Sequence, residues 1–336
     1  MSSVIFLPYR DIHPGRGVIS RISGDITMSK SKSRLDHVCQ SITNNIIAAI
    51  AAGVGQWKTP WSAVLSSAPA NVVTGHFYRG INVLSLALAS KKLGYSTHFW
   101  AGFSQWKAAG CKVRSGERGT QVLYARPVEV KDENDEVVST WWSIHYSHVF
   151  NLDQVEGWQA SEAIVKAVAA RADQPGPGLN DHRIEQVEHL VRCTGAEVRT
   201  AGKAYYNVGG DYIGMPPIEA FSRKDPEKGL TDYYSTLLHE LTHWTGSSSR
   251  CNRQLGLRGT RDYAFEELVA ELGSAFLCAS HGVEQTPRED HAQYIAYWVK
   301  QLEEDNRAII KAARLAQESA EFLMGLVDEA ERKQAA

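Results

Sequence analysis

Two histidines and a glutamate form the pattern H-E-x-x-H at His239-Glu240-Leu-Thr-His243. On a helix, residues four apart share a face, so both imidazoles can converge on one metal ion while Glu240 flanks the open coordination position. Neutral imidazole is a good ligand for Zn²⁺, and a carboxylate beside the metal can take a proton from water. The pattern predicts a zinc-hydrolase helix, with Glu240 catalytic and His239 and His243 as ligands. Another divalent cation is the alternative to Zn²⁺.

A third ligand is expected on a second helix, predicted over residues 265–277. Glu267 and Glu271 are four apart and share one face of that helix, beside an apolar face. One carboxylate can bind the metal while the other orients a ligand histidine from behind. We predict Glu267 as the ligand and Glu271 as the orienting residue, with the reverse assignment as the alternative.

A hairpin is predicted just before the metal helix, with strands over residues 204–208 and 211–215 joined through Gly209-Gly210. Such a hairpin could offer an edge strand, along which an extended peptide adds itself by backbone hydrogen bonds. Tyr233 and Tyr234 are expected to pack on the metal helix. The alternative is that one of them reaches the tetrahedral intermediate of hydrolysis.

Charge is distributed unevenly along the chain, although the net charge is only −2. Residues 28–126 hold 12 Lys and Arg against 2 Asp and Glu, a net charge of +10, whereas residues 127–336 hold 21 against 34, a net charge of −13. A basic segment of this size favours a polyanionic partner.

Aromatic and basic residues alternate within the basic segment, in sequence typical of loops and turns. Bases stack on aromatic rings while Lys and Arg follow the phosphates, which is what binding a single nucleic-acid strand requires. The pattern therefore predicts a surface for single-stranded DNA. The residues assigned to it are Trp57, Lys58, Trp61, Tyr78, Arg79, Asn82, Lys112, Arg114 and Arg118.

The pattern of elements predicts an α+β protein of two domains, and 336 residues suffice for two cores. We expect a poorly structured extension over residues 1–34, a DNA-binding domain over 35–157, a linker over 158–178 and a metallopeptidase domain over 179–336. The linker contains the Pro/Gly-rich joint 173–178. Helices are predicted over 35–52, 83–93, 161–171 and 181–193, and two more between 294 and 327.

The sequence contains no apolar run of membrane-spanning length, and its N-terminus lacks the order of a secretory signal. Its five cysteines are widely scattered, with no Cys-x-x-Cys pair. This usage is typical of reduced thiols, and we predict a cytoplasmic protein without a membrane partner.

Several segments, taken together, resemble the ArdC family of plasmid antirestriction proteins and the N-terminal part of the TraC-type plasmid primases. The resemblance covers roughly residue 35 to the end of the chain. The segments that carry it are Trp57-Lys-Thr-Pro-Trp61, Tyr78-Arg-Gly-Ile-Asn82, Gly116-Glu-Arg-Gly-Thr120, His239-Glu-Leu-Thr-His-Trp-Thr-Gly246 and Tyr263-Ala-Phe-Glu-Glu-Leu-Val-Ala-Glu271.

The resemblance implies an N-terminal domain that binds single-stranded DNA and a C-terminal zincin-like metallopeptidase domain similar to the Spartan and SprT group. It also implies a role in protecting incoming conjugative DNA from host restriction. The Spartan-like relatives use a third histidine where this chain offers Glu267 and Glu271, so their substrate chemistry does not carry over. The extension before Met28 also departs from the family pattern.

These observations lead to one main hypothesis and two rivals. In the main hypothesis, Zn²⁺ on His239, His243 and Glu267 activates water, Glu240 acts as general base, and bound DNA brings an unknown protein substrate to the site. In the first rival, the protein is a DNA-binding shield whose metal site is structural or vestigial. In the second, it is an ordinary metallopeptidase whose basic domain binds acidic proteins.

Overall fold

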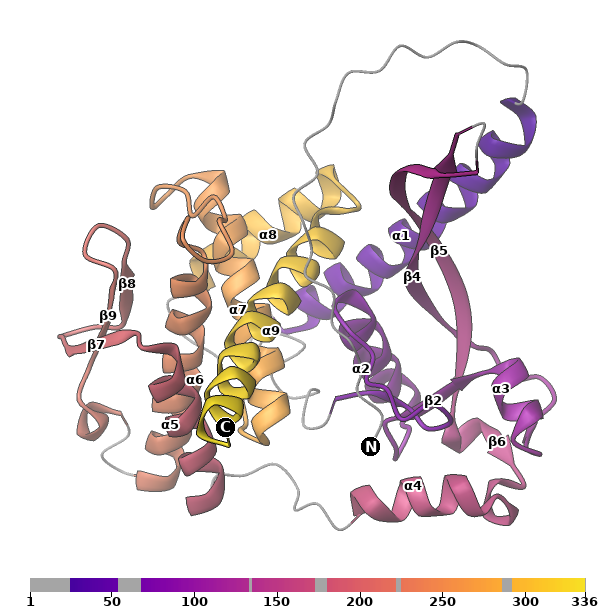
Figure 1. The fold of residues 1–336 in the computed structure, drawn as a ribbon, viewed down its shortest axis with the longest axis horizontal. Helices are drawn as coiled ribbons and strands as arrows, with labels where there is room; N and C mark the ends of the chain where they lie inside the picture. The colour runs from indigo at the N-terminus through magenta and orange to yellow at the C-terminus, as the bar shows by residue number, and fades with distance from the viewer. Residues whose placement is uncertain are drawn as a thin grey trace.

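The computed structural model describes residues 25–53, 68–132, 135–172, 180–221, 225–285 and 292–335. Figure 1 shows a sheet-containing N-terminal part beside a mainly helical C-terminal part, as an α+β protein of two domains requires.

The N-terminal part is built on a sheet with strand order β1-β2-β5-β4. The sheet is antiparallel except for β1, which runs parallel to β2. Strands β4 and β5 form a long ribbon within this sheet. They pair from Thr120, which lies opposite Val149, to Lys131, which lies opposite Val137. The elements of this part are α1 (Asp25–Gly53), β1 (Ala70–Asn71), α2 (Ile81–Leu93), β2 (Phe99–Gly102), α3 (Phe103–Ala108), β3 (Lys112–Val113), β4 (Thr120–Lys131), β5 (Val137–Asn151), η2 (Leu152–Gln154), β6 (Val155–Glu156), η3 (Trp158–Ala160) and α4 (Glu162–Ala172).

Two boundaries of the N-terminal part differ from those expected. Helix α1 begins at Asp25, so the last residues of the expected extension are helical. Trp158 and Ile164 lie in the expected linker, yet they pack in one cluster with Phe99, Trp106 and Leu152. Residues 158–172 therefore belong structurally to the N-terminal part, because burial of these apolar side chains holds them there.

The C-terminal part is a helical bundle with a small sheet of order β7-β9-β8. Strand β8 pairs antiparallel with β9 as the hairpin prediction requires, and β7, which the sequence did not indicate, runs parallel to β9. The elements are α5 (Asp181–Thr194), β7 (Glu197–Thr200), β8 (Tyr205–Asn207), β9 (Tyr212–Met215), η4 (Ile218–Ala220), α6 (Pro226–Thr245), α7 (Arg261–His281), α8 (Ala292–Glu304) and α9 (Ala308–Gln334).

Helices α6 and α7 approach each other closely at the centre of the bundle. Gly273 on α7 faces Thr242 on α6, and a Cβ atom at Gly273 would lie 2.4 Å from Thr242 Cγ2. Only a residue without a side chain fits this contact, since real Cβ atoms do not approach other atoms so closely. The glycine thus brings together the two helices that carry the candidate metal ligands.

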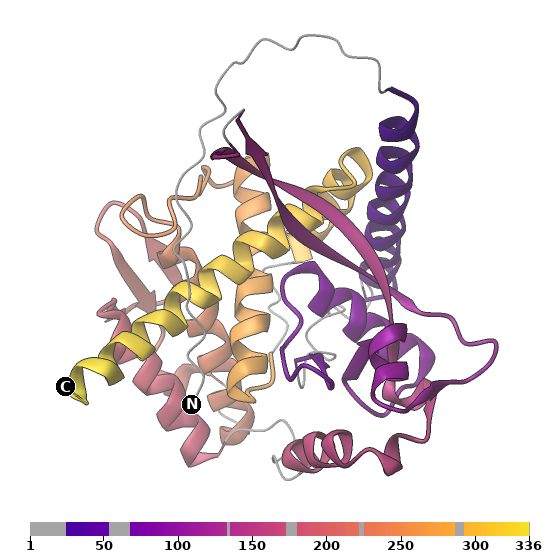
Figure 2. The same cartoon turned by 45° about the vertical axis from the view of Figure 1, so that its right-hand side comes forward.

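The two parts share a continuous apolar core. Buried side chains of α1 and α2, including Ile46 and Leu84, cluster with those of α6, α7, α8 and α9, including Leu241, Trp298 and Ile309. Figure 2 shows α9 crossing the molecule along α7 toward the N-terminal elements, where it contacts α2. Helices from both halves of the sequence therefore bury each other's apolar surface.

All five cysteines are free thiols, and none joins a disulfide. Among the described residues, no helix combines the length and apolarity needed to cross a membrane.

Candidate metal centre and nucleic-acid interface

Helix α6 carries both candidate histidines on one buried face. The helix starts sharply, because the Asp225 side chain accepts a hydrogen bond from the Lys228 backbone N–H at 3.1 Å and Pro226 occupies its first turn. His239, Glu240 and His243 lie in its buried C-terminal half. The two imidazole centroids are 4.8 Å apart, with their planes at 80°.

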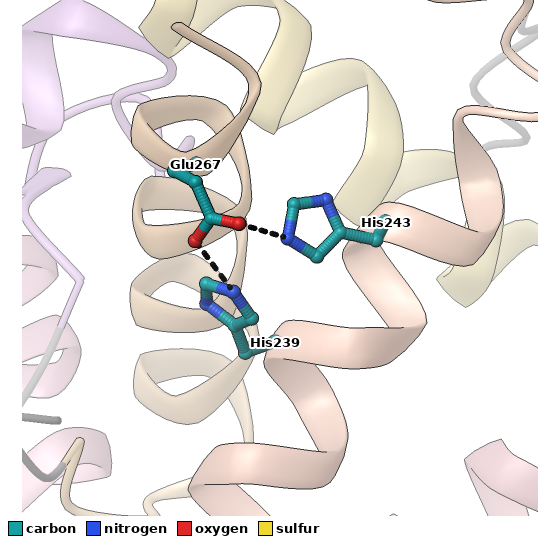
Figure 3. A group of neighbouring side chains, drawn as sticks. All are labelled: His239, His243 and Glu267. Carbon is teal, nitrogen blue, oxygen red and sulfur yellow. Dashed lines mark ion pairs between the residues drawn. The ribbon is translucent and has the colours of Figure 1, made fainter. Parts of the chain in front are cut away.

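Glu267 on α7 lies between the two imidazoles (Figure 3). Its Oε2 is 3.6 Å from His239 Nε2, and its Oε1 is 3.5 Å from His243 Nε2. The three side chains are buried and offer ligand atoms within 4.8 Å of one another. The structure thus brings together the three residues that the sequence analysis selected as ligands.

Two more buried carboxylates contact the outer nitrogens of the imidazoles. Glu271 Oε2 lies 3.6 Å from His239 Nδ1, the position expected of the orienting residue. Glu266 Oε1 lies 3.2 Å from His243 Nδ1, a contact that the sequence analysis missed. A carboxylate behind a ligand histidine fixes the ring's orientation and tautomer. Each histidine therefore lies between two carboxylates. Glu267 is near Nε2 of both rings, and Glu271 or Glu266 is near Nδ1.

Arg253 holds Glu266 in place. Its guanidinium donates to both Glu266 oxygens at 2.7 and 3.0 Å, and also to the Thr242 carbonyl, the Thr245 hydroxyl and the Ser319 hydroxyl. Both Arg253 and Glu266 are buried, and such a paired, fully hydrogen-bonded arrangement is what a buried charge requires. No helical period marks this pair in the sequence, because Arg253 lies in the loop between α6 and α7.

The cluster is rich in carboxylates, and its close contacts shift the pKa values of its members. Burial opposes the charged form of His243, but hydrogen bonds to Glu266 and Glu267 prevail and raise its pKa to about 10. Burial likewise disfavours the Glu267 carboxylate, yet its contacts with the two imidazoles hold its pKa below the ordinary range. Two imidazole nitrogens and an ionised carboxylate are a ligand set of catalytic zinc sites, so the residues fit a divalent cation.

A cavity opens over this cluster, and the buried Glu240 is one of the residues that line it. Strand β8 borders it, and β8 is an edge strand of its sheet, as the hairpin prediction expected. The side chains that line the cavity are Ala204, Tyr205, Tyr206, Val208, His239, Glu240, His243, Leu255, Arg258, Tyr263, Glu266, Glu267 and Tyr294, together with Gly256.

Arg250 fixes the hairpin to the end of the metal helix. It donates to the Trp244 carbonyl at 2.6 Å, lies over the Trp244 ring at 3.8 Å and pairs with Asp211 in the β8–β9 turn. Tyr206 of β8 donates to Asp211 at 2.8 Å. These contacts set the distance between the edge strand and the histidines.

Tyr233 and Tyr234 pack as expected and are not among the residues that line the cavity. The Tyr234 hydroxyl donates to Glu188 on α5 at 2.9 Å, and the Tyr233 ring packs edge-on against Phe221 at 5.5 Å. Tyr263 and Tyr294 line the cavity instead.

The structure describes six of the nine residues predicted to bind DNA. Trp57, Lys58 and Trp61 lie outside the described residues. The Asn82 amide clamps the main chain of Leu123, donating to its carbonyl at 2.6 Å and accepting from its N–H at 2.8 Å. Asn82 therefore joins α2 to the edge of β4.

Tyr78 and Arg79 also make contacts within the protein. Burial raises the pKa of the half-buried Tyr78 to about 12. Arg79 pairs with Glu321 on α9, and the neighbouring Gly80 N–H donates to Gln317 on the same helix at 3.0 Å. This segment connects the N-terminal part to α9.

Lys112, Arg114 and Arg118 are exposed near the start of the β4–β5 ribbon. Arg114 pairs with Glu117 at 2.7 Å, and the Arg118 carbonyl accepts a hydrogen bond from Gln154 at 3.0 Å. These three side chains remain candidates for contact with phosphate.

Comparison with known proteins gives the same two-part division. Residues 36–164 match the N-terminal domain of the anti-restriction factor ArdC, and residues 185–315 match a zincin-like metallopeptidase domain. Two crystal structures of the antirestriction protein ArdC of plasmid R388 superpose on this fold. The metal-free structure has a TM-score of 0.69 at 35% identity and covers 87% of this chain and 98% of that one. The chain belongs to the ArdC family. The second ArdC structure, with Mn(II) bound, has a TM-score of 0.66 at 34% identity over 86% and 97% of the two chains.

Relatives by sequence include proteins of similar and of greater length. The uncharacterized protein y4eC of Sinorhizobium fredii is 33% identical over 92% of this chain and 98% of its own. Two DNA primases TraC of Escherichia coli are 30% and 29% identical over 85% and 84% of this chain. They are matched over only 27% and 19% of their own lengths. The ArdC-like unit thus also occurs within longer proteins.

Metal binding is expected to tighten as the pH rises from 6 to 8. With its pKa near 10, His243 holds a proton throughout this range, and the imidazole must lose that proton before it can coordinate. Release of one proton makes the apparent affinity for Zn²⁺ rise about tenfold per pH unit. Calorimetric titrations in buffers of different ionisation enthalpy measure both quantities. An affinity that is flat over this range, with no proton released, would contradict the raised pKa.

Proposed function

We propose that this ArdC-family chain is an antirestriction protein that binds single-stranded DNA and carries a functional metallopeptidase site. The observation that carries the proposal is the cluster of His239, His243 and Glu267 beside Glu240, in a cavity bordered by an edge strand. The basic charge of the N-terminal half supports a polyanionic partner, and DNA is the polyanion that an antirestriction protein meets.

Zn²⁺ is the cation that we assign to the site, held by His239, His243 and Glu267. Two imidazoles and one carboxylate are typical of catalytic zinc. Mn²⁺ is the alternative, because a related ArdC structure is Mn(II)-bound.

In this mechanism Glu240 is the general base. A divalent cation held by His239, His243 and Glu267 would supply Lewis acidity toward the peptide carbonyl and the attacking water. The Glu240 carboxylate takes the proton of that water and returns it to the leaving amine. Glu271 and Glu266 hold the two imidazoles in orientation from behind.

The edge of β8 is the proposed docking site for the substrate. An extended peptide that adds to this edge by backbone hydrogen bonds would lie over the cavity, beside Glu240. Arg250 keeps β8 at a fixed distance from α6, so the peptide carbonyl is held near the histidines. The substrate class is a protein that meets the DNA bound by the N-terminal part.

The biological role follows from these two activities. We propose that the protein acts in the cytoplasm, where five free cysteines stay reduced, and protects incoming plasmid DNA from host restriction. In the competing account the protein shields DNA and the metal site is structural. Protection of DNA then does not require the Glu240 carboxylate, and this difference can be measured.

Replacing Glu240 with Gln is expected to abolish protection of a conjugative plasmid that enters a restricting host. The change removes the proton acceptor and should lower turnover by about 100-fold or more, while metal and DNA binding persist. Transfer frequency into restricting and non-restricting recipients measures the effect. Glu318→Gln, an equivalent change at a partly exposed site on α9, is the control. Full protection by Glu240→Gln would reject the peptidase mechanism and favour the shield.

Single-stranded DNA is expected to bind more tightly than duplex DNA of equal length, with an affinity that falls steeply as salt is raised. Stacking needs unpaired bases, and phosphate neutralisation releases counterions. Fluorescence anisotropy over a salt series measures both effects. Equal affinity for the two forms would remove single-strand binding from the proposed function and leave the metal site unaffected.

A further inference from the structure

The β4–β5 ribbon extends beyond the rest of its sheet. Strand β2 pairs only with residues 149–151 of β5, so most of the ribbon is two-stranded. Figure 2 shows this part of the ribbon projecting across the molecule, away from β2. Side chains alternate between the two faces of such a ribbon, so each face has its own composition.

One face of the ribbon carries a stack of rings with a cation on it. Tyr124 and His145 lie opposite each other in the register, with ring centroids 5.6 Å apart and planes at 21°. Arg126, the next residue of β4 on this face, places its guanidinium carbon 5.1 Å from the Tyr124 ring centroid. Tyr124 is 37% exposed, and Ser143 lies opposite Arg126. We call Tyr124, Arg126, Ser143 and His145 the stacking face.

The charges of the two faces differ. By alternation, the side of the ribbon that carries the stacking face holds every second residue of 122–130 and of 139–147, and none of these is Asp or Glu. Glu129 lies on the opposite face, together with Ile144, which is 46% exposed. Four further acidic residues, at positions 132, 133, 135 and 136, belong to the connection between β4 and β5 in the sequence. The stacking face therefore suits an anionic ligand that also offers flat rings.

We propose that the stacking face of the β4–β5 ribbon binds single-stranded DNA, a site that deepens the proposed function and rests on it. A base stacks on the ring pair of Tyr124 and His145, and Arg126 neutralises an adjacent phosphate. Ser143 presents a small hydroxyl beside Arg126, which leaves room for the sugar-phosphate chain. A paired base has no open face for this stack, so the site selects single strands.

The contacts of the sequence-predicted residues support this location. Asn82 and Arg79 are engaged with Leu123 and Glu321. Arg118 is exposed just before β4 begins at Thr120. A strand that leaves the stacking face at the base of the ribbon would therefore meet Arg118 next.

Fluorescence anisotropy with a labelled oligothymidylate tests the site on the full chain. Tyr124→Ala removes a stacking ring and is expected to weaken binding about tenfold or more, whereas Tyr124→Phe keeps the ring and should stay within about twofold. Arg126→Ala should reduce the slope of log affinity against log salt by about 0.7, the share of one phosphate contact. Ile144→Ala, on the opposite face of the same ribbon, is the matched control.

A second pair of variants tests charge without removing any ring. Ser143→Glu places a carboxylate on the stacking face and should weaken binding, while Ala125→Glu places the same charge on the opposite face and should not. Circular dichroism confirms that each variant is folded. If the wild type binds the oligonucleotide and Tyr124→Ala and Ser143→Glu bind as tightly, the stacking face is not the site, and single-strand binding itself stands. If the wild type does not bind, both proposals fail.

Discussion

The burial of four carboxylates around two imidazoles is the constraint on which the rest of the C-terminal part depends. Glu240, Glu266, Glu267 and Glu271 are all buried, and buried carboxylates destabilise a fold unless hydrogen bonds or cations compensate them. Arg253 pairs with Glu266, and the raised pKa of His243 adds a second cation beside Glu266 and Glu267. The divalent ion that we propose would replace the proton of His243. The Gly273 contact between α6 and α7 makes the arrangement possible, because it brings the carboxylates of one helix against the histidines of the other.

Helix α9 links this constraint to the N-terminal part. Its Ser319 accepts a hydrogen bond from Arg253, the residue that holds Glu266. Close to Ser319 on the same helix, Glu321 and Gln317 bind Arg79 and the Gly80 backbone. Helix α9 thus contacts both Arg253, which holds Glu266 beside His243, and the segment Arg79–Gly80, which precedes α2. The shared core, in which α1 and α2 pack with the C-terminal helices, also holds the N-terminal part against the C-terminal part. A DNA strand bound by the N-terminal part would lie at a fixed place relative to the cavity.

The cluster of candidate metal ligands could be predicted from the sequence because helical spacing is local. His239 and His243 fall on one face of α6, and Glu267 and Glu271 on one face of α7, whichever way the helices pack. Glu266 escaped notice because its partner, Arg253, comes from a loop that only the tertiary fold brings near. The assignment of Asn82 and Arg79 to DNA, which rests on their residue types, stays a prediction, and the fold adds contacts of Asn82 with β4 and of Arg79 with α9. A sequence identifies the type of each side chain, but it does not identify the segment that the side chain contacts in the folded protein. The stacking face was missed for the same reason, since cross-strand neighbours such as Tyr124 and His145 are far apart in the chain.

The most direct test of this account is the metal content of the protein, with and without the Glu267 carboxylate. Wild type, Glu267→Gln and the surface control Glu318→Gln would be loaded with Zn²⁺ or Mn²⁺, freed of excess ion and analysed by mass spectrometry for metals. Our account predicts about one ion per chain in the wild type and in the control, and a large loss in Glu267→Gln, which should remain folded by circular dichroism. Equal metal content in all three proteins, or none in the wild type, would contradict the claim that this cluster is a divalent metal site.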